Sequence, residues 1–593
     1  MSIDKESLSF KRTKYCGEFT KDDAGETVIA VGWVEKQRDL GNLIFIDLRD
    51  RTGIIQLTIY ENKVSKEYFS NASRCRAEFV IAARGVVQLR NEKNENLKTG
   101  EIEICVEQLN ILSQSKTPPF EIRNIYKTSL ELRSKYRYLE LRNKDMQNTL
   151  MFRHKIVKYT RDFFDENGFL EIETPILIKS TPEGARDYLV PSRVHKGSFY
   201  ALPQSPQLYK QLLMVAGYDR YFQIAKCFRD EDLRAHRQPE FTQIDLEMSF
   251  VDEEDIININ EKYVKGLFSK ILNINLKTPF IRLNYSQAME MYGSDKPDIR
   301  FEMKIINITE GLKQSNFKIF KSAATSGGVY AINLKDKADK MSRKNIDKLV
   351  EFVKTYRAKG LAYSKPYENF SSFEKFLSNE EVEYIYKSTN ANKNDIIFIV
   401  ADENRETALL SLGALRVYLA EKFELYNKNQ FAFLWVLKFP LFEYSEEEKR
   451  YISKHHPFTA ISDEDLNILE TQPENCHAKA YDLVLNGCEI GGGSVRINSE
   501  EIQKRVFKAL NFTESEIEEK FGFLVEAFKY GAPPHAGMAY GLDRLVMIML
   551  KKSSIRDVIA FPKMQNACEL MTNSPGHVQQ KQLDELNIAI KNN

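Results

Sequence analysis

Cysteine and long apolar runs are both scarce in this sequence. Its seven cysteines are scattered over 593 residues, and none belongs to a Cys-x-x-Cys pair. This usage argues against a disulfide framework or a zinc ribbon and favours a reducing compartment. No run of about 18 apolar residues occurs, and residues 1–6 lack the apolar core of a signal peptide. These absences predict a cytoplasmic protein with no membrane partner.

An excess of charge of one sign is also missing. Lysine and arginine number 85, aspartate and glutamate number 84, and the net charge is +1. The molecule as a whole therefore has no strong attraction to nucleic acid, so any RNA binding must come from local basic patches. The content of 42% apolar and 28% charged residues is typical of a folded protein. The length allows roughly four domains.

The most informative stretch, 222–250, predicts two antiparallel strands joined by a long charged loop. The second strand alternates with period two, which gives it a core face and a polar face. The core face carries Thr242, Ile244, Leu246, Met248 and Phe250, and the polar face carries Phe241, Gln243, Asp245 and Glu247. On the first strand, Arg229 lies on a face with small neighbours. The loop, 230–240, suggests a lid over a phosphate-bearing substrate, although a plain edge hairpin explains the same pattern.

Residues 1–114 read as short strands separated by turn signals and predict an OB-fold β-barrel. Along 42–50, Ile44, Ile46 and Leu48 should point inward, and the outward residues are Leu43, Phe45, Asp47 and Arg49. An aromatic ring among charges can stack on an unpaired base, although a stray exposed aromatic is the plainer explanation. Hydrogen bonds and charge for such a base can come from Arg38, Gln56 and Glu103.

Three stretches resemble, in the correct order, the signature motifs of class II aminoacyl-tRNA synthetases. Phe228-Arg-Asp-Glu231, followed by Arg237 to Gln243, closely resembles motif 2 of the bacterial aspartyl enzymes. A helix from 150 to 167, a strand over 169–174 and Pro175 resemble motif 1, which builds the dimer interface of the class. Residues 537–550, in which an arginine expected to be buried opens an apolar helix, resemble motif 3.

The resemblance covers nearly the whole chain and implies an α+β multidomain protein. It would comprise an OB-fold barrel that binds the anticodon, a catalytic core built on an antiparallel sheet, and an α/β insertion domain. The predicted divisions are 1–114 for the barrel, 115–143 for a hinge, 144–299 for the first part of the core, 300–427 for the insertion and 428–593 for the second part of the core.

The activity that the resemblance implies is that of an aspartate–tRNA ligase. ATP would activate L-aspartate to aspartyl-adenylate, and the aspartyl group would pass to the 3′ end of tRNA-Asp. The family uses Mg²⁺ and works as a homodimer. Neither step requires a protein nucleophile, because positioning and charge stabilisation suffice.

Carried over residue by residue, the motifs assign an ATP site. Arg229 would hold the α-phosphate and Arg544 the distal phosphates, which makes these two arginines the catalytic residues. Phe241 would stack on adenine, and Asp482 and Glu489 would take Mg²⁺. The full ATP set is Arg229, Asp230, Glu231, Gln238, Phe241, Glu489, Gly541, Leu542, Asp543 and Arg544.

The family also assigns an aspartate site. Arg496 would chelate the side-chain carboxylate through two parallel hydrogen bonds, with Lys210 as a second cation and His455 closing over it. Asparagine carries no charge there and would leave buried cations unpaired. Glu183, Gln207 and Asp245 would receive the ammonium group, and Arg229 completes the set.

Two local patterns concern the backbone near these residues. Ser205 is expected to cap a helix that starts at Pro206 and carries Gln207 and Lys210 on one side. The glycines at 491–493 lack the spacing of a phosphate-binding P-loop. We expect them to let a ligand approach a strand closely.

Two features depart from the family pattern. Residues 340–344, Lys-Met-Ser-Arg-Lys, look like the ATP loop of class I synthetases, but none of the eight histidines lies in the His-x-Gly-His signature of that class. We interpret this segment as the start of a helix. His236 stands where the family usually has an aspartate in the motif 2 loop, which would give the loop a pH-dependent charge.

Three alternatives stay open. An asparaginyl or lysyl enzyme shares the barrel and core, but the insertion and the Lys210/Arg496 pair speak against both. A synthetase-like RNA-binding regulator would be expected to lack the motif arginines or the barrel. An enzyme that charges both tRNA-Asp and tRNA-Asn often has a histidine where this chain has Leu40, so we expect strict charging of tRNA-Asp. Leu40 completes the anticodon set with Arg38, Phe45, Gln56 and Glu103.

Overall fold

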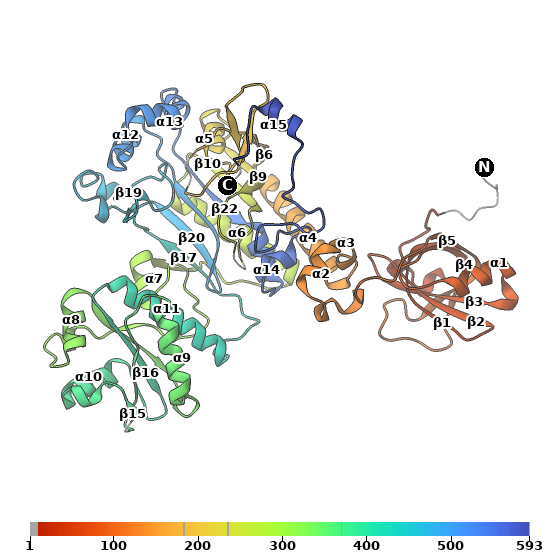
Figure 1. Ribbon diagram of the computed structural model, residues 1–593, viewed down its shortest axis with the longest axis horizontal. Coiled ribbons are helices and arrows are strands. Elements are labelled where there is room, and N and C mark those ends of the chain that lie inside the picture. The colour runs from red at the N-terminus through yellow and green to blue at the C-terminus, as the bar shows by residue number, and fades with distance from the viewer. Residues whose placement is uncertain (1–9, 182–183, 234–235, 369, 592–593) are drawn as a thin grey trace. The chain divides into compact units, whose positions relative to one another are not determined.

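The computed structural model describes residues 10–181, 184–233, 236–368 and 370–591. The chain forms two compact units, each traced in Figure 1. One unit contains the residues up to 153 together with 556–577, and the other contains 154–555 together with the residues from 578 onward. All the barrel strands belong to the first unit, and the large sheet belongs to the second.

The first unit is built around a closed barrel with the strand order β1-β2-β3-β5-β4. Ile44, Ile46 and Leu48 are 0% exposed inside it, as predicted. Arg49, expected on the outer face, is buried because its guanidinium pairs with two carboxylates, those of Glu35 and Glu78. The elements are β1 (Thr27–Asp39), β2 (Leu43–Arg49), β3 (Ile54–Tyr60), α1 (Lys66–Arg74), β4 (Val80–Leu89) and β5 (Ile102–Ser113).

The segment 556–577 packs with the first unit, whereas the sequence placed it with the catalytic core. Helix α2 (Leu130–Lys135) leads into the short helix α3 (Arg137–Glu140), which carries the contact. The buried Arg137 donates hydrogen bonds to the backbone carbonyls of Ala560 and Ile559, each at 2.8 Å. The first pair lies 423 positions apart, and local sequence patterns carry no information at that distance.

The second unit is organised on a sheet with the strand order β11-β17-β20-β21-β22-β10-β9-β6. The inner strands from β17 to β9 pair antiparallel, as predicted, whereas the outermost pairs, β11–β17 and β9–β6, are parallel. The bounds are β6 (Leu170–Glu171), β9 (Arg220–Phe228), β10 (Glu240–Ser249), β11 (Ile281–Asn284), β17 (Phe433–Leu437), β20 (Ala480–Leu485), β21 (Cys488–Val495) and β22 (His535–Gly541). The strands of motifs 2 and 3, β10 and β22, are therefore neighbours.

Strands β9 and β10 form the predicted hairpin, with Asp245 opposite Gln223. The apolar residues of β10 are buried on the core face, but Phe250 is 73% exposed with φ of +58°, contrary to the prediction. The reason is that β10 ends one residue earlier, at Ser249. The polar face is also covered, since Asp245 is 1% and Glu247 0% exposed.

Two boundaries near the motifs differ from the prediction. Helix α5 (Gln207–Val215) begins one residue later than expected, with Pro206 as its N-cap, while the Ser205 hydroxyl accepts a bond from the Gln207 amide at 3.3 Å. The strand expected over 169–174 is only β6. The helices of this unit include α4 (Lys144–Glu166), which spans both units, α6 (Glu253–Leu272), α7 (Tyr285–Tyr292), α12 (Glu500–Ala509), α13 (Glu514–Phe528), α14 (Leu542–Met549) and α15 (Gln580–Leu586). Two short hairpins are β7 (Leu189–Pro191) with β8 (Phe199–Ala201), and β18 (Phe442–Ser445) with β19 (Arg450–Ser453).

A separate antiparallel sheet with the order β12-β13-β16-β14-β15 lies within the segment expected to be the insertion. Its elements are β12 (Ile306–Asn307), α8 (Lys318–Ser326), β13 (Gly328–Leu334), α9 (Arg343–Lys354), β14 (Ala362–Lys365), β15 (Phe370–Ser371), α10 (Asn379–Ser388), β16 (Ile396–Asp402) and α11 (Arg405–Lys422). The Ser342 hydroxyl accepts a bond from the Asn345 amide and caps α9. Residues 340–344 are thus a helix start, as interpreted.

All seven cysteines are free thiols. Within the described ranges, no helix is both long and apolar enough to cross a membrane.

Candidate functional site

Two adjoining cavities lie on the polar face of the large sheet. The inner cleft, of about 410 Å³, opens between α5, β10, β20 and β21. The outer cavity, of about 210 Å³, lies between the loop that joins β9 to β10 and the start of α14. The two adjoin, since both are lined by Arg229, Glu231, Gln243, Glu489 and Ala539.

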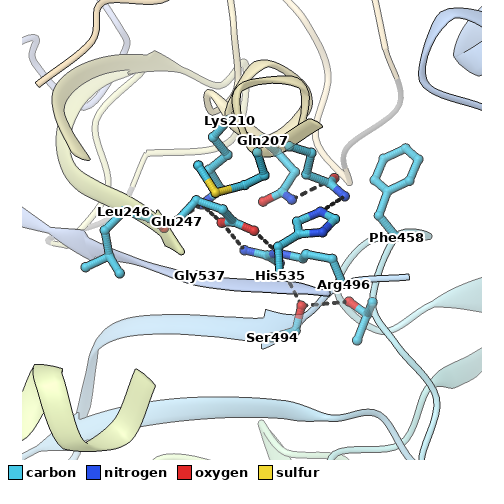
Figure 2. Close-up of polar contacts among 12 residues, drawn as sticks. Gln207, Lys210, Leu246, Glu247, Phe458, Ser494, Arg496, His535 and Gly537 are labelled. Carbon is cyan, nitrogen blue, oxygen red and sulfur yellow. Dashed lines mark hydrogen bonds and ion pairs between the residues drawn. The ribbon is translucent and has the colours of Figure 1, made fainter. Parts of the chain in front are cut away.

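Four charged side chains are buried together at one side of the inner cleft, and Figure 2 shows three of them, Lys210, Glu247 and Arg496. Glu247, which is 0% exposed, accepts bonds from Arg496 Nε at 2.9 Å and Nη2 at 3.1 Å. The Lys210 ammonium lies 3.2 Å from the same carboxylate and 2.6 Å from that of Asp245. Two cations thus face two anions. Such a cluster is stable away from water only if each group is paired and hydrogen-bonded.

The last nitrogen of Arg496 is also engaged. Nη1 donates to Ser494 Oγ at 2.6 Å and contacts His456 Nε2 at 2.7 Å. A guanidinium has only donors, so a hydrogen bond between these two nitrogens requires His456 Nε2 to be unprotonated. Burial, and then the charge of Arg496, hold the pKa of His456 well below its ordinary range.

Glu247 and His456 were missed at the sequence level. The sequence assigned the fork of Arg496 to a substrate carboxylate, but in the structure its two parallel bonds go to Glu247. The period-two pattern offered a signal, because Glu247 shares the polar face of β10 with Asp245. Strand β22 makes room for it: a Cβ on Gly537 would lie 1.8 Å from Glu247 Oε2.

Three buried polar atoms of the inner cleft have no hydrogen-bond partner among the described residues: Asp245 Oδ2, Arg229 Nε and His455 Nε2. Leaving such groups unpaired is costly, so their clustering indicates a place for a ligand. One is an acceptor on a carboxylate, one is a cationic donor and one is an imidazole nitrogen. Burial raises the pKa of Asp245 and lowers the pKa of His455. Glu183, expected here, lies outside the described residues, although its neighbours Gly184 and Ala185 line the cleft.

Asp482 and Glu489 lie close together on β20 and β21. A Cβ on Gly492 would be 2.3 Å from Asp482 Oδ1 and 3.8 Å from Glu489 Oε1, so both carboxylates lie over this glycine. Likewise, a Cβ on Gly493 would lie 2.0 Å from the backbone carbonyl oxygen of Gly537. These two glycines therefore leave room for groups of the protein itself, and they also line the cleft, where a ligand is expected to approach the strand.

This carboxylate pair fits Mg²⁺. Burial, followed by the charge of Glu489, raises the pKa of Asp482 well above its ordinary range, so a cation would relieve the repulsion. No group of three or more His, Cys, Asp and Glu side chains able to hold a metal occurs in the described part of the chain. Mg²⁺ commonly uses one or two carboxylates and takes its other ligands from water and substrate phosphates.

The outer cavity collects most of the expected nucleotide residues. It is lined by Arg229, Glu231, Gln238, Phe241, Glu489, Gly541, Asp543 and Arg544. The expectation that Arg544 is buried is wrong. Its side chain is 28% exposed, and it donates a hydrogen bond to the backbone carbonyl of Glu489. Leu542 is buried in the core, and Asp230 pairs with Arg186 at 2.6 Å, so neither lines a cavity.

His236 also lines the outer cavity. Partial burial, and then the positive charge of Arg544, lower the pKa of this histidine below its ordinary 6.5. The loop therefore keeps a neutral imidazole at neutral pH, and the charge change expected from the sequence is shifted to more acidic conditions.

The barrel brings together the residues expected to contact an anticodon. The Arg38 guanidinium lies 5.2 Å from the centre of the Phe45 ring and donates to Gln56 at 3.1 Å. Gln56 in turn donates to Glu103 at 2.6 Å. Leu40 is 66% exposed in the adjoining turn. Two further donors to Glu103 were not foreseen: Thr58 at 2.7 Å and Gln88 at 2.8 Å.

Two family models match this chain, one over the barrel and one over the segment that contains the large sheet. The family model for tRNA synthetases class II (D, K and N) matches residues 129–565, and that for the OB-fold nucleic acid binding domain matches residues 28–112. An aspartate–tRNA ligase of Ruminiclostridium cellulolyticum is 56% identical over 98% of each chain. An aspartate–tRNA(Asp/Asn) ligase of Caldanaerobacter subterraneus is 54% identical over 98% of each chain. A crystal structure of asparaginyl-tRNA synthetase from Pyrococcus horikoshii shares the fold, with a TM-score of 0.60 and 19% identity over 93% of this chain and 98% of that one.

The buried Asp482 gives a prediction for stability against pH. Because its folded pKa lies above its ordinary 3.8, the fold binds this proton more tightly than the unfolded chain does. The stabilisation is complete below the unfolded pKa and is lost as pH rises through the folded pKa. Asp482→Asn should therefore raise Tm at neutral pH, with a gain that shrinks toward about pH 4. Calorimetric melting across this range measures the effect.

Asp463→Asn is the matched control, because the Asp463 side chain is 80% exposed. Its Tm should stay close to that of the parent protein at every pH. A lower Tm for Asp482→Asn at neutral pH would contradict the assignment of a strained carboxylate.

Proposed function

The chain belongs to the class II tRNA synthetases of the D, K and N group, and we propose that its two cavities bind L-aspartate and ATP. It is an aminoacyl-tRNA ligase that activates aspartate and charges tRNA-Asp. The observation that carries the assignment of the inner cleft is the pair of buried cations, Lys210 and Arg496, beside three unpartnered polar atoms. The family link supports the use of ATP in the outer cavity.

The reaction proceeds in two displacements. An oxygen of the aspartate α-carboxylate attacks the α-phosphorus of ATP, and pyrophosphate leaves with the electrons of the broken phosphorus–oxygen bond. The 3′-hydroxyl of tRNA then attacks the activated carbonyl carbon, and AMP leaves. Arg229, which lines both cavities, is placed to hold the reacting phosphate while negative charge develops. Arg544 at the start of α14 would hold the distal phosphates.

Aspartate fits the unpartnered atoms of the inner cleft by charge. Its ammonium group would donate to Asp245 Oδ2 and to Gln207, with Glu183 as a third acceptor from the loop. Its α-carboxylate would face Arg229. Its side-chain carboxylate would lie against Lys210 and Arg496, with His455 closing over it.

The same arrangement disfavours asparagine. The two cations, Lys210 and Arg496, have hydrogen-bond donors but no acceptors, and a side-chain amide has one acceptor oxygen where a carboxylate has two. The side-chain amide of asparagine would present N–H groups to these donors. Sites that leave buried polar groups unpaired by a wrong substrate can reject it by factors of about 10⁴ to 10⁵.

The remaining ligands follow from the cavity linings. Adenine would stack on Phe241, with Glu231 and Gln238 beside it. Asp482 and Glu489 would hold Mg²⁺, which when bound neutralises phosphate charge and favours attack by an anion. The Arg38, Phe45, Gln56 and Glu103 cluster would read the anticodon in the barrel. The free thiols support a cytoplasmic location.

ATP–pyrophosphate exchange tests the substrate. Aspartate should support exchange, and asparagine should be slower by about 10⁴-fold. Arg496→Leu should abolish exchange, and Lys210→Met should reduce it less completely, because lysine provides a point charge and not a fork. Lys226→Met, an exposed lysine on β9, is the matched control and should exchange normally. Normal exchange by folded Arg496→Leu would sink the aspartate assignment.

A homodimer is supported by apolar side chains at the β6 edge of the sheet. Leu170, Ile176 and Leu177 are 52%, 49% and 52% exposed, and this edge carries the motif 1 match. Leu170→Glu should shift sedimentation toward monomer because it places a charge in the interface. Ile281→Glu, an exposed isoleucine on the opposite edge strand, should leave the dimer intact. A fully active monomer of the parent protein at micromolar concentration would refute the dimer.

Charging of purified tRNA-Asp and tRNA-Asn tests anticodon reading. We expect strict use of tRNA-Asp, since the exposed Leu40 offers no polar contact near Phe45. Leu40→His should then raise charging of tRNA-Asn selectively. Phe45→Ala should weaken binding of tRNA-Asp by about 1–3 kcal/mol through lost stacking. Comparable rates on both tRNAs would contradict strict use of tRNA-Asp. They would favour the alternative of an enzyme that charges both tRNAs, and some relatives are named aspartate–tRNA(Asp/Asn) ligase.

A further inference from the structure

A chain of hydrogen bonds runs from the inner cleft into the protein interior. Gln207 Nε2 donates to Gln211 Oε1 at 3.0 Å, and Gln211 Nε2 lies 3.1 Å from His535 Nε2. His535 Nδ1 lies 2.8 Å from the backbone carbonyl of Pro533. Gln211 and His535 are 0% exposed, so water does not supply substitutes for these bonds. Of these three side chains only that of Gln207, at the outer end of the series of hydrogen bonds, lines the cleft.

We call the hydrogen bonds that link Gln207, Gln211, His535 and the Pro533 carbonyl the relay. The donor and the acceptor of each bond follow from the inner end of the relay, at the Pro533 carbonyl. A carbonyl oxygen can only accept, so His535 Nδ1 must carry the proton. Neutral imidazole has one N–H group, which leaves Nε2 as an acceptor and Gln211 Nε2 as its donor. Gln211 then offers its oxygen to Gln207 Nε2. The amide nitrogen of Gln207 is thereby engaged, and its amide oxygen is left for the cleft.

The neutral ring that this direction requires agrees with the surroundings of His535. Burial lowers the pKa of this histidine, as do the charges of Arg496 and Lys210, whereas Glu247 raises it. Figure 2 shows His535 beside these charged groups, between Gln207 and Arg496. Protonation would place a second N–H group against Gln211 and reverse the order of donors and acceptors along the relay.

We propose that Gln211 and His535 are positioning residues that fix the amide of Gln207 with its oxygen toward the α-ammonium group of the substrate. The proposal rests on the proposed function, in which Gln207 receives that group. The two ends of an amide have nearly the same shape, so packing alone does not choose between them. The reversed amide would present N–H groups to the ammonium. The relay fixes the orientation of the Gln207 amide because it ends at a backbone carbonyl, which can only accept a hydrogen bond.

Removing the relay while comparing two ligands tests the proposal. Succinate has both carboxylates of aspartate but no ammonium group, and it serves as a competitive inhibitor of aspartate-dependent ATP–pyrophosphate exchange. Gln211→Leu should raise the KM for aspartate about tenfold, the scale of a hydrogen bond to a charged group. The Ki of succinate and the KM of ATP should change less than about twofold, and kcat should fall little because the ammonium contact is equally present in ground and transition states. Equal weakening of aspartate and succinate would overturn the proposal.

Two further variants separate positioning from packing. His535→Phe keeps a ring of similar shape and removes both nitrogens, so it should repeat the selective loss. The double variant should be no worse than either single variant, because both interrupt one relay. Asn333→Leu is the matched control: Asn333 is also a buried amide, but it lies on β13 and donates to the backbone carbonyls of Thr389 and Asn390, outside the relay. It should leave the ratio of aspartate KM to succinate Ki unchanged, and a selective loss in this control would contradict the relay.

The parent protein provides a test that does not depend on any variant folding. ¹⁵N NMR of histidine-labelled protein, with His535→Phe or fragment assignment identifying the signal, should show a neutral ring protonated at Nδ1. An Nε2–H tautomer or an imidazolium at neutral pH would overturn the relay. Absence of aspartate-dependent exchange in the parent protein would instead count against the proposed function, so the two failures are distinguishable.

Discussion

The carboxylate of Glu247 is the constraint on which the site depends. It binds Arg496 through two parallel bonds and also lies 3.2 Å from Lys210, so one buried anion sets the positions of both cations. An unpaired cation in this interior would be strongly destabilising. The neighbouring strand has glycine at 537 because the carboxylate occupies the space of a side chain. Sheet register, strand composition and substrate charge are thus linked through one group.

In this arrangement one set of groups holds the buried charges in place, and a different set of atoms is available to contact a ligand. Glu247 fixes the guanidinium, while Asp245, Arg229 and His455 each keep one buried atom without a hydrogen-bond partner among the described residues. The fixed groups supply an ordered electric field, and the unpartnered atoms supply the contacts that a ligand completes. The protein sustains their cost because the surrounding sheet is well packed. The close carboxylates of Asp482 and Glu489 add a similar strain, which a bound cation would relieve.

Much of this organisation follows from short-range sequence rules, and the exceptions have physical causes. The spacing placed Gln207 and Lys210 on one side of a helix, and the alternation placed Asp245 and Glu247 on one face of β10. That these two sets share a cleft was implied by the family resemblance. Alternation did not reveal that Glu247 would bind Arg496, because those two residues lie 249 positions apart in the sequence. Phe250 left the core face because β10 ends before it. The packing of 556–577 depends on backbone carbonyls, which are the same in every sequence.

A crystal structure with a sulfamoyl analogue of aspartyl-adenylate tests the central claim most directly. Retention of the Glu247–Arg496 pair is expected, with the ammonium nitrogen about 3 Å from Asp245 Oδ2 and the sulfamoyl group at Arg229. The side-chain carboxylate should lie against Lys210 and Arg496. The account would be contradicted if Glu247 were displaced from Arg496, or if the side-chain carboxylate pointed away from both cations.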